Sequence, residues 1–233
     1  MPQPLRIAVM PGDGIGPEVV TEAVHCLETL REKHQLPVEW TRFPWPSHAW
    51  HEQYGEVMPG DALEQLRDYH AILLGALGDP GPMDDPDRYL LSDSVSLAPL
   101  LEMRKGFDQW VCERPARLLP GARQYLADDR ARDIDMLVIR ENSEGEYVGQ
   151  GGRLRQGTEH EVATQMEVFT RRGTERIIRY GFEQARLRAE ARKRDGQKRE
   201  FPTRSGQRCE SQVCVVTKRN ALRYWGEIGR AHV

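Results

Sequence analysis

The sequence predicts an α/β protein built on a parallel or mixed sheet, and three short stretches carry that prediction. Leu5 to Met10 (LRIAVM) is an apolar run that ends in a proline and three glycines, which is typical of a buried strand entering a tight loop. Apolar residues then recur at helical spacing from Val19 to Leu30. Ala71 to Gly75 (AILLG) is another apolar run of strand length. Alternating strands and helices favour a parallel or mixed sheet.

The first predicted helix begins at Gly16, the expected N-cap, and Pro17 follows where a missing N–H costs nothing. A further strand is predicted over Val38 to Phe43 and a short helix over Asp61 to Tyr69. Between them, Trp40 to Gly60 is rich in tryptophan and proline. We expect that stretch to be a packed irregular connection.

The second half of the chain changes character. Ile134 to Ile139 is predicted as a strand, Glu159 to Thr170 alternates in a β-like way, and Thr174 is expected to open an amphipathic helix. From Arg186 to Arg208 the chain carries nine Arg or Lys against three Asp or Glu. This run is predicted to be an exposed or disordered insertion, in preference to a nucleic-acid-binding surface. Gln212 to Thr217 is expected to resume as a strand.

Length and charge restrict the class of partner. The chain has 233 residues, enough for one large or two small domains, and a formal net charge of −3. That charge gives no sign of affinity for nucleic acid or an anionic membrane. The four cysteines form no C-x-x-C pair, and no apolar run approaches the roughly 20 residues of a membrane span. We expect a cytoplasmic protein whose partners are small molecules or other subunits.

The glycines after the first strand do not fit the dinucleotide-binding fingerprint. They fall at positions 12, 14 and 16, so the third comes one residue too early for G-x-G-x-x-G. Asp13 would also compete with a phosphate for the positive end of the following helix. From these residues alone, a plain tight turn remains open beside an unusual binding loop.

Several longer stretches follow one another in a distinctive order. They are PGDGIGPEVV (11–20), AILLGALGDP (71–80), LLEMRKGFDQWVCERPARLLPG (100–121), DIDMLVIRENSEGEYVGQGGR (133–153), GTEHEVATQMEVFTRRGTERIIRYGFEQA (157–185) and VVTKRNALRYW (215–225). In this order they resemble the β-decarboxylating dehydrogenases, the family of isopropylmalate, isocitrate, tartrate and D-malate dehydrogenases. Members of that family bind NAD without the usual glycine fingerprint.

The resemblance implies an incomplete isopropylmalate-dehydrogenase-like α/β fold. Residues 1–103 would form the N-terminal part of the large α/β domain, and residues 104–227 a small domain. The small domain would hold a β-rich dimerisation arm at about 144–170 and the charged insertion at 186–208. Family members continue into an Asp-rich metal motif and an adenosine-binding loop, so no metal ligand is expected in this chain, and this exact chain is expected to be inactive.

The last residues, Ile228 to Val233 (IGRAHV), correspond to a translation of ATC GGA AGA GCA CAC GTC, a common sequencing-adapter read. We expect them to be a non-native tail on a truncated gene model. An intact genomic clone that encodes these residues followed by a stop codon would refute this expectation.

Three arginines match the family's substrate clamp: Arg104 in EMRK, Arg114 in ERP and Arg140 in VIREN. A hydroxy diacid presents two carboxylates, and planar guanidinium groups bind carboxylates bidentately, which fixes orientation as well as charge. The resemblance therefore assigns these arginines to substrate binding.

The resemblance also assigns the groups that move protons. Tyr147 in EGEYVG resembles the tyrosine that returns a proton to the enol after loss of carbon dioxide. Lys218 in VTKRNAL resembles the lysine that takes the hydroxyl proton, and it would act in the partner subunit's site, which implies a homodimer. Ile15, Gly78 and Asn220 are the expected contacts of NAD.

The implied reaction is hydride transfer from C2 to NAD, followed by loss of carbon dioxide, assisted by Mg²⁺ or Mn²⁺. The stretches IRENSEGEY, GTEHEV and VFTRRG resemble the tartrate and D-malate branch more than isopropylmalate dehydrogenases. The alternatives are 3-isopropylmalate dehydrogenase and a non-catalytic α/β binding or assembly module. One departure from the branch is Glu113, which could pair with an arginine and weaken the clamp, or face solvent.

Overall fold

The computed structural model describes residues 3–78, 97–203 and 205–230. The chain divides into two compact units, an N-terminal unit, Met1–Phe107, and a C-terminal unit, Asp108–Val233. The expected domain boundary between residues 103 and 104 falls inside helix α5 (Ala98–Gly106). Among the described residues, no helix is both long and apolar enough to cross a bilayer.

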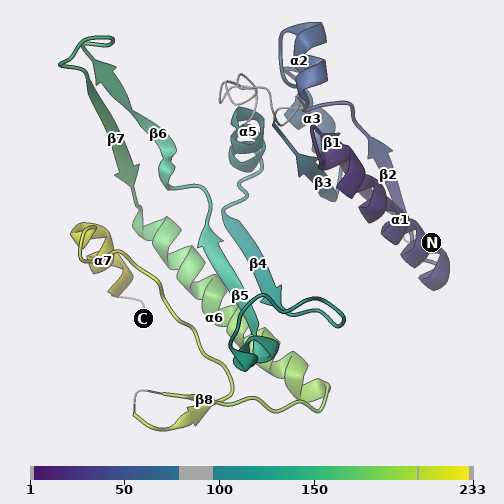
Figure 1. The fold of residues 1–233 in the computed structure, drawn as a ribbon, viewed down its shortest axis with the longest axis vertical. Helices are drawn as coiled ribbons and strands as arrows, with labels where there is room; N and C mark the ends of the chain where they lie inside the picture. The colour runs from purple at the N-terminus through teal and green to yellow at the C-terminus, as the bar shows by residue number, and fades with distance from the viewer. Residues whose placement is uncertain (1–2, 79–96, 204, 231–233) are drawn as a thin grey trace. The chain divides into compact units, whose positions relative to one another are not determined.

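The N-terminal unit is built on a three-stranded parallel sheet in the order β2-β1-β3 (Figure 1). Its strands are β1 (Leu5–Gly12), β2 (Val38–Arg42) and β3 (Ala71–Ala76), and helix α1 (Gly16–His34) follows β1. The three predicted strands and the first helix are therefore confirmed. Because all three strands are parallel, the loops that follow them meet at one edge of the sheet.

The core of this unit lies on the central strand. Met10 is fully buried and packs with apolar side chains from the connections and from two short helices, α3 (Ala62–Leu66) and α5. The buried members of this cluster are Ala8, Met10, Trp45, Met58, Ala62, Leu66 and Met103. Apolar burial of this kind is the main stabilising contribution to the unit.

The stretch expected to be an irregular connection contains a helix, α2 (His48–Tyr54). The Ser47 hydroxyl oxygen accepts a hydrogen bond from the Trp50 amide at 3.1 Å, which caps the first turn. Gly55 ends the helix with φ +75°, a conformation that glycine adopts without steric cost. The expectation was wrong for this stretch because these two local signals outweigh the aromatic and proline-rich composition.

The C-terminal unit contains a long helix, two longer antiparallel ribbons and a very short third one that pairs β8 with β9 (Figure 1). One ribbon pairs β4 (Val111–Arg117) with β5 (Asp135–Glu141), and helix α6 (Arg171–Arg194) contacts β5. The other pairs β6 (Gly145–Leu154) with β7 (Val162–Val168) and forms the extended arm in Figure 1. The smaller elements are η2 (Asp129–Asp133), β8 (Phe201–Pro202), β9 (Arg208–Cys209) and α7 (Arg223–Arg230).

Helix α6 begins one turn earlier than expected. Its N-cap is Thr170, whose hydroxyl oxygen accepts from the Gly173 amide at 2.9 Å, whereas Thr174 lies buried in the first turn. The Thr170 amide and hydroxyl donate to the Glu144 carboxylate at 2.8 and 2.6 Å. This contact from the start of the β6 arm selects Thr170 as the cap.

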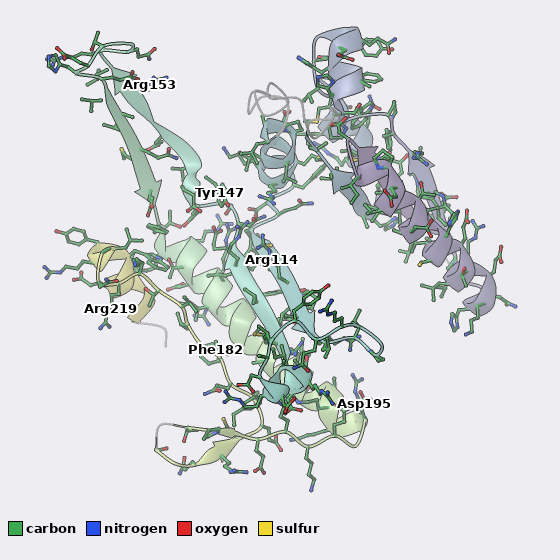
Figure 2. The ribbon with its side chains drawn as sticks, in the orientation of Figure 1. Arg114, Tyr147, Arg153, Phe182, Asp195 and Arg219 are labelled. Atoms are coloured by element: carbon green, nitrogen blue, oxygen red, sulfur yellow. The ribbon has the colours of Figure 1, made fainter. Side chains whose placement is uncertain are left out.

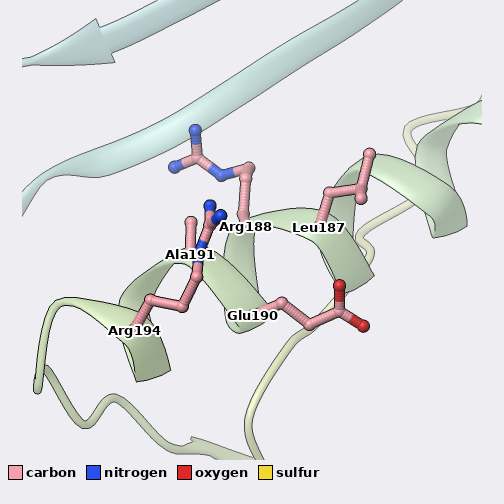
Figure 3. Close-up of a pocket in the computed structure, with 5 residues that line it drawn as sticks. All are labelled: Leu187, Arg188, Glu190, Ala191 and Arg194. Atoms are coloured by element: carbon pink, nitrogen blue, oxygen red, sulfur yellow. The ribbon is translucent and has the colours of Figure 1, made fainter.

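The expected charged insertion at 186–208 is not separate from α6 over its first part. The helix continues to Arg194, and Arg186 forms ion pairs with Glu183 and Glu190 one turn away on either side. Arg188 reaches across to Asp135 on β5 at 2.6 Å. Its side chain points toward the strand in Figure 3. Helical spacing of opposite charges gives this basic run a regular structure.

The strand expected over Gln212 to Thr217 is not formed. The chain is irregular from Ser211 to Lys218, and Val216 is 89% exposed. A strand requires a hydrogen-bonding neighbour, and no strand in the described part of the chain pairs with this segment. Beyond it, Trp225 of α7 stacks on Phe169 with ring centroids 4.9 Å apart.

Candidate active site

The β4–β5 ribbon places two of the predicted arginines on one face. Cys112 lies opposite Arg140 and Arg114 opposite Val138 in the antiparallel register. Residues directly opposite each other share a face, and so do residues two apart on one strand. Arg114 and Arg140 are therefore diagonal neighbours on the same side of the ribbon, and Figure 2 shows Arg114 on β4 near the start of the arm.

Glu113 faces the opposite side of this ribbon. Its carboxylate accepts a hydrogen bond from the Tyr180 hydroxyl of α6 at 2.9 Å. This bond, with a smaller contribution from burial, raises the pKa of the Tyr180 phenol. Of the two alternatives for Glu113, exposure to solvent is the one the structure shows: Glu113 is exposed, and its bond to α6 directs it away from Arg114 and Arg140.

Arg140 is in direct contact with Tyr147. Its Nη1 donates to the Tyr147 hydroxyl oxygen at 3.1 Å, and the guanidinium carbon lies 5.4 Å from the ring centroid. A phenol oxygen that accepts from a guanidinium must direct its own hydrogen elsewhere, because the guanidinium has no acceptor. The pair thus presents a cation and a phenolic proton side by side.

Asn142 holds the other end of the guanidinium, and sequence reasoning missed this residue. Its Oδ1 accepts from Arg140 Nη2 at 2.7 Å, and its Nδ2 donates to the Gln109 carbonyl at 3.2 Å. The Asn142 side chain is only 5% exposed. Its place two residues after Arg140, in the quoted IRENSEGEY stretch, was the signal that could have found it.

A second network fixes the turn between β5 and β6. The Glu141 carboxylate accepts from the Ser143 and Glu144 amides at 2.9 and 2.7 Å. Arg176 of α6 donates to the Ser143 hydroxyl at 2.7 Å and to Glu141 at 3.3 Å. Its guanidinium also lies over the Trp110 ring, 4.8 Å from the centroid. These contacts tie the turn that leads into β6, the strand of Tyr147, to the helix.

The remaining predicted residues lie on other elements of the chain. Arg104 is half-buried on α5 of the N-terminal unit. Lys218 and Asn220 are exposed, in the irregular stretch and turn that precede α7. Among the described residues, no hydrogen bond or ion pair joins the Lys218 side chain to Arg140 or Tyr147.

Asp13 organises the carboxyl edge of the parallel sheet. Its Oδ1 accepts from the His48 amide at 2.8 Å, and the Gly78 amide also donates to it. The carboxylate therefore meets the start of α2 and not the start of α1. Burial raises the pKa of Asp13, and these two amides partly offset that rise. Ile15, the observed N-cap of α1, is 62% exposed beside this edge.

The glycines of the first loop serve its close approach to β3. Gly12 has φ +72°, and a Cβ added there would overlap the Ala76 carbonyl oxygen. A Cβ on Gly16 would overlap the Pro11 carbonyl and the Ala76 amide. The loop is therefore packed against its own chain at these positions, which explains a glycine spacing different from the pyrophosphate-binding fingerprint.

The described residues do not make a metal site. No group of three or more His, Cys, Asp or Glu side chains converges anywhere in residues 3–78, 97–203 or 205–230. The family resemblance implies a divalent cation, but the carboxylates of Glu141 and Glu144 are already occupied by amides, hydroxyls and Arg176. Both carboxylates are therefore engaged by groups of this chain.

Two hollows beside the C-terminal half of α6 are separate from this cluster. One, of about 440 Å³, is lined by Leu187, Arg188, Glu190, Ala191 and Arg194 (Figure 3). The other, of about 700 Å³, is lined by Arg132, Asp133, Ile134, Asp135, Arg192, Gln197, Lys198 and Arg199. No predicted site residue lines either hollow.

Curated proteins of known activity are similar in sequence to this chain. D-malate dehydrogenase [decarboxylating] of Escherichia coli (strain K12) is 45% identical over 188 residues, which cover 81% of this chain and 50% of the relative. The 3-isopropylmalate dehydrogenase of Thermobifida fusca (strain YX) is 45% identical over 181 residues, covering 78% of this chain and 49% of the relative. The chain thus spans about half the length of the curated relatives it matches.

A solved structure shows the same fold. The isocitrate dehydrogenase from Methylococcus capsulatus superposes with a TM-score of 0.66 at 27% identity, covering 97% of this chain and 56% of that one. The family model described as isocitrate/isopropylmalate dehydrogenase matches residues 6–198. The chain therefore belongs to the isocitrate/isopropylmalate dehydrogenase family, whose members are decarboxylating dehydrogenases.

Proposed function

We propose that the protein containing this chain oxidises and decarboxylates a 2-hydroxy diacid of the tartrate or D-malate type, with NAD as the hydride acceptor and Mg²⁺ or Mn²⁺ as the metal. The observation that carries the proposal is the contact between the Arg140 guanidinium and the Tyr147 phenol, on the face that also holds Arg114. A cation and a phenolic proton are the groups that an anionic substrate and its enol require.

In this proposal Arg114 and Arg140 bind the carboxylates of the substrate. Their diagonal placement on one ribbon face lets both guanidinium groups reach one small dianion, since diagonal neighbours are separated by about 7–8 Å. Tyr147 then gives its proton to the carbon from which carbon dioxide has left. Arg140 keeps the phenol oriented during this transfer by its hydrogen bond to the phenol oxygen.

Residues outside this cluster complete the proposed site. Arg104 is the third cation of the clamp, and Ile15, Gly78 and Asn220 are the proposed NAD contacts. NAD, when bound, supplies the acceptor for the hydride that leaves C2. Exposed Ile15 and the carboxyl edge of a parallel sheet are consistent with a cofactor there. The 233-residue chain alone is proposed to be inactive, because the resemblance assigns none of its residues to the metal.

Lys218 is proposed to accept the hydroxyl proton in the site of a second subunit, so that the protein acts as a homodimer. The β6–β7 arm supports a partner. It is a single two-stranded ribbon, and its apolar side chains Leu154, Val162 and Met166 are 65%, 48% and 54% exposed. Free strand edges and exposed apolar residues on one element favour pairing with another chain.

The substrate branch rests on resemblance and needs direct measurement. The D-malate and 3-isopropylmalate relatives share the same 45% identity with this chain, so identity does not separate a small polar diacid from one with a branched apolar group. A 3-isopropylmalate dehydrogenase is therefore the alternative.

The test is formation of NADH by the complete protein that contains this chain, with Mn²⁺ or Mg²⁺ and with D-malate, tartrate or 3-isopropylmalate. NADP is assayed in parallel. The proposal expects the highest kcat/KM for D-malate or tartrate with NAD. Highest activity on 3-isopropylmalate would select the alternative, and no turnover of any hydroxy diacid would favour a non-catalytic α/β module.

A further inference from the structure

Two half-buried arginines of the C-terminal unit, Arg140 and Arg176, differ in the groups that pair with their charge. Arg176 lies 3.3 Å from carboxylate oxygens of both Asp108 and Glu141. Arg140 instead donates to two neutral groups, the Tyr147 hydroxyl and the Asn142 amide oxygen. No carboxylate of the described residues forms an ion pair with Arg140, and its buried Nε has no partner among them. Its charge therefore remains available.

The orientation of the Asn142 amide follows from its partners. A guanidinium only donates and a backbone carbonyl only accepts, so the oxygen must face Arg140 and the nitrogen must face the Gln109 carbonyl. The Asn142 backbone amide is fixed as well, by donation to the Trp110 carbonyl at 2.9 Å. The acceptor for Arg140 is thus held from three sides in a side chain that is 5% exposed.

We propose that Asn142 is a positioning residue, which fixes the Arg140 guanidinium through an uncharged acceptor and so keeps the charge of Arg140 for an anionic ligand. An aspartate in the same place would hold the guanidinium equally well but would neutralise it. An amide at this position therefore fixes the geometry of the Arg140 guanidinium without neutralising its charge. That the ligand is a hydroxy diacid rests on the proposed function.

The positioning is tested by NMR of the Arg side chains in the chain itself, with the Arg140 signals assigned from Arg140→Lys. Because the two Nη groups have different partners, wild type is expected to give two resolved Nη signals for Arg140. Asn142→Ala should merge them, since the guanidinium can then rotate, and Asn142→Asp should keep them resolved. Signals that stay resolved in Asn142→Ala would overturn the positioning role.

The charge-sparing role is tested by kinetics of the complete protein. Asn142→Asp is expected to raise KM for the best hydroxy diacid by about tenfold or more, with a change in kcat below about threefold, because binding loses a cation while the Tyr147 contact persists. Gln207→Glu, at an exposed residue just before β9 and outside the arm, is the matched control for added charge and should change neither. A wild-type KM in Asn142→Asp would overturn this role.

The two proposals fail in different ways. If wild type turns over no diacid, the proposed function fails, and a titration of the Arg140 signals with tartrate replaces KM as the readout. Wild type should then respond to tartrate at concentrations about tenfold lower than Asn142→Asp does. An Arg140 signal that does not respond in wild type would overturn the charge-sparing role.

Discussion

The two units of the chain are stabilised by different forces. Every buried hydrophobic side chain of the described residues lies in the N-terminal unit, with the exceptions of Ala131 and Ala189. In the C-terminal unit, ion pairs join α6 to neighbouring elements, as between Arg176 and Glu141 and between Arg188 and Asp135. Apolar periodicity is visible in a sequence, whereas the partner of an arginine is not.

This difference bears on function. The apolar core of the N-terminal unit fixes the carboxyl edge of a sheet, where Asp13 joins the loops after all three strands. The polar C-terminal unit presents Arg140 and Tyr147 on a surface whose shape depends on hydrogen bonds. Substitutions should therefore damage the two units by different mechanisms.

The largest difference in the free energy of unfolding is expected when the same change, methionine to alanine, is made once in each unit. Met10→Ala removes a fully buried side chain and should lower the free energy of unfolding of the N-terminal unit by about 2–5 kcal/mol. Met136→Ala, at a residue 52% exposed on β5, should cost no more than about 0.5 kcal/mol. Hydrogen exchange in urea measures each unit separately. Equal costs would contradict the comparison.

Arg176→Met should show that polar contacts hold the C-terminal unit. The variant keeps much of the side-chain volume over Trp110 but leaves Glu141 without its cation, and we expect a loss of about 2 kcal/mol in the free energy of unfolding. Arg179→Met, exposed on the same helix, is the control. If both variants unfold at the same urea concentration, the network contributes little to stability.

Asp13 should give the N-terminal unit a pH-dependent component. Because its pKa is raised in the folded state, the wild type loses stability as pH rises from the ordinary carboxyl value of 3.8 through the raised value. Asp13→Asn keeps an acceptor for the His48 amide without the buried charge, so it should match or exceed wild type at neutral pH. Asp13→Ala leaves that amide unpaired and should cost about 1–2 kcal/mol.

Thermal unfolding between about pH 4 and about pH 8, which spans the carboxyl range and neutrality, checks these expectations. The gap between Asp13→Asn and wild type should close toward acid pH. A gap that widens toward acid pH would show that folding stabilises the ionised carboxylate, which is the opposite of a raised pKa.

The smallest effect is expected at Tyr180. Its pKa is raised by the bond to Glu113, so this bond contributes below the ordinary tyrosine value of 10.0 and is lost as pH rises through the raised pKa. Tyr180→Phe should cost about 0.5–1 kcal/mol at neutral pH, since the bond is partly exposed. Tyr125→Phe, at a residue 90% exposed, should cost nothing measurable by urea unfolding.

Much of the N-terminal unit could be predicted from the sequence because burial leaves a visible pattern. Apolar runs marked β1 and β3, and helical spacing marked α1. Helix α2 was missed although Ser47 and Gly55 carry ordinary capping signals, because composition was weighed above the caps.

The C-terminal unit was harder to predict because its elements depend on distant contacts. Thr170 and Thr174 are both acceptable caps, and Glu144 decides between them. Arg140 and Tyr147 were found through resemblance, and their contact is a result of the fold. The role of Asn142 could not be predicted from its neighbours in the sequence. It depends on the Gln109 carbonyl, which lies in the connection between α5 and β4.

The most direct test of the central claim is kcat/KM of the complete protein carrying Arg140→Ala, measured with its best hydroxy diacid and compared with Arg179→Ala. The loss of a bidentate cation that also orients the Tyr147 phenol should lower kcat/KM by about 10³-fold or more, while Arg179→Ala stays close to wild type. An Arg140→Ala enzyme within about tenfold of wild type would contradict the assignment of this guanidinium and phenol to the reaction.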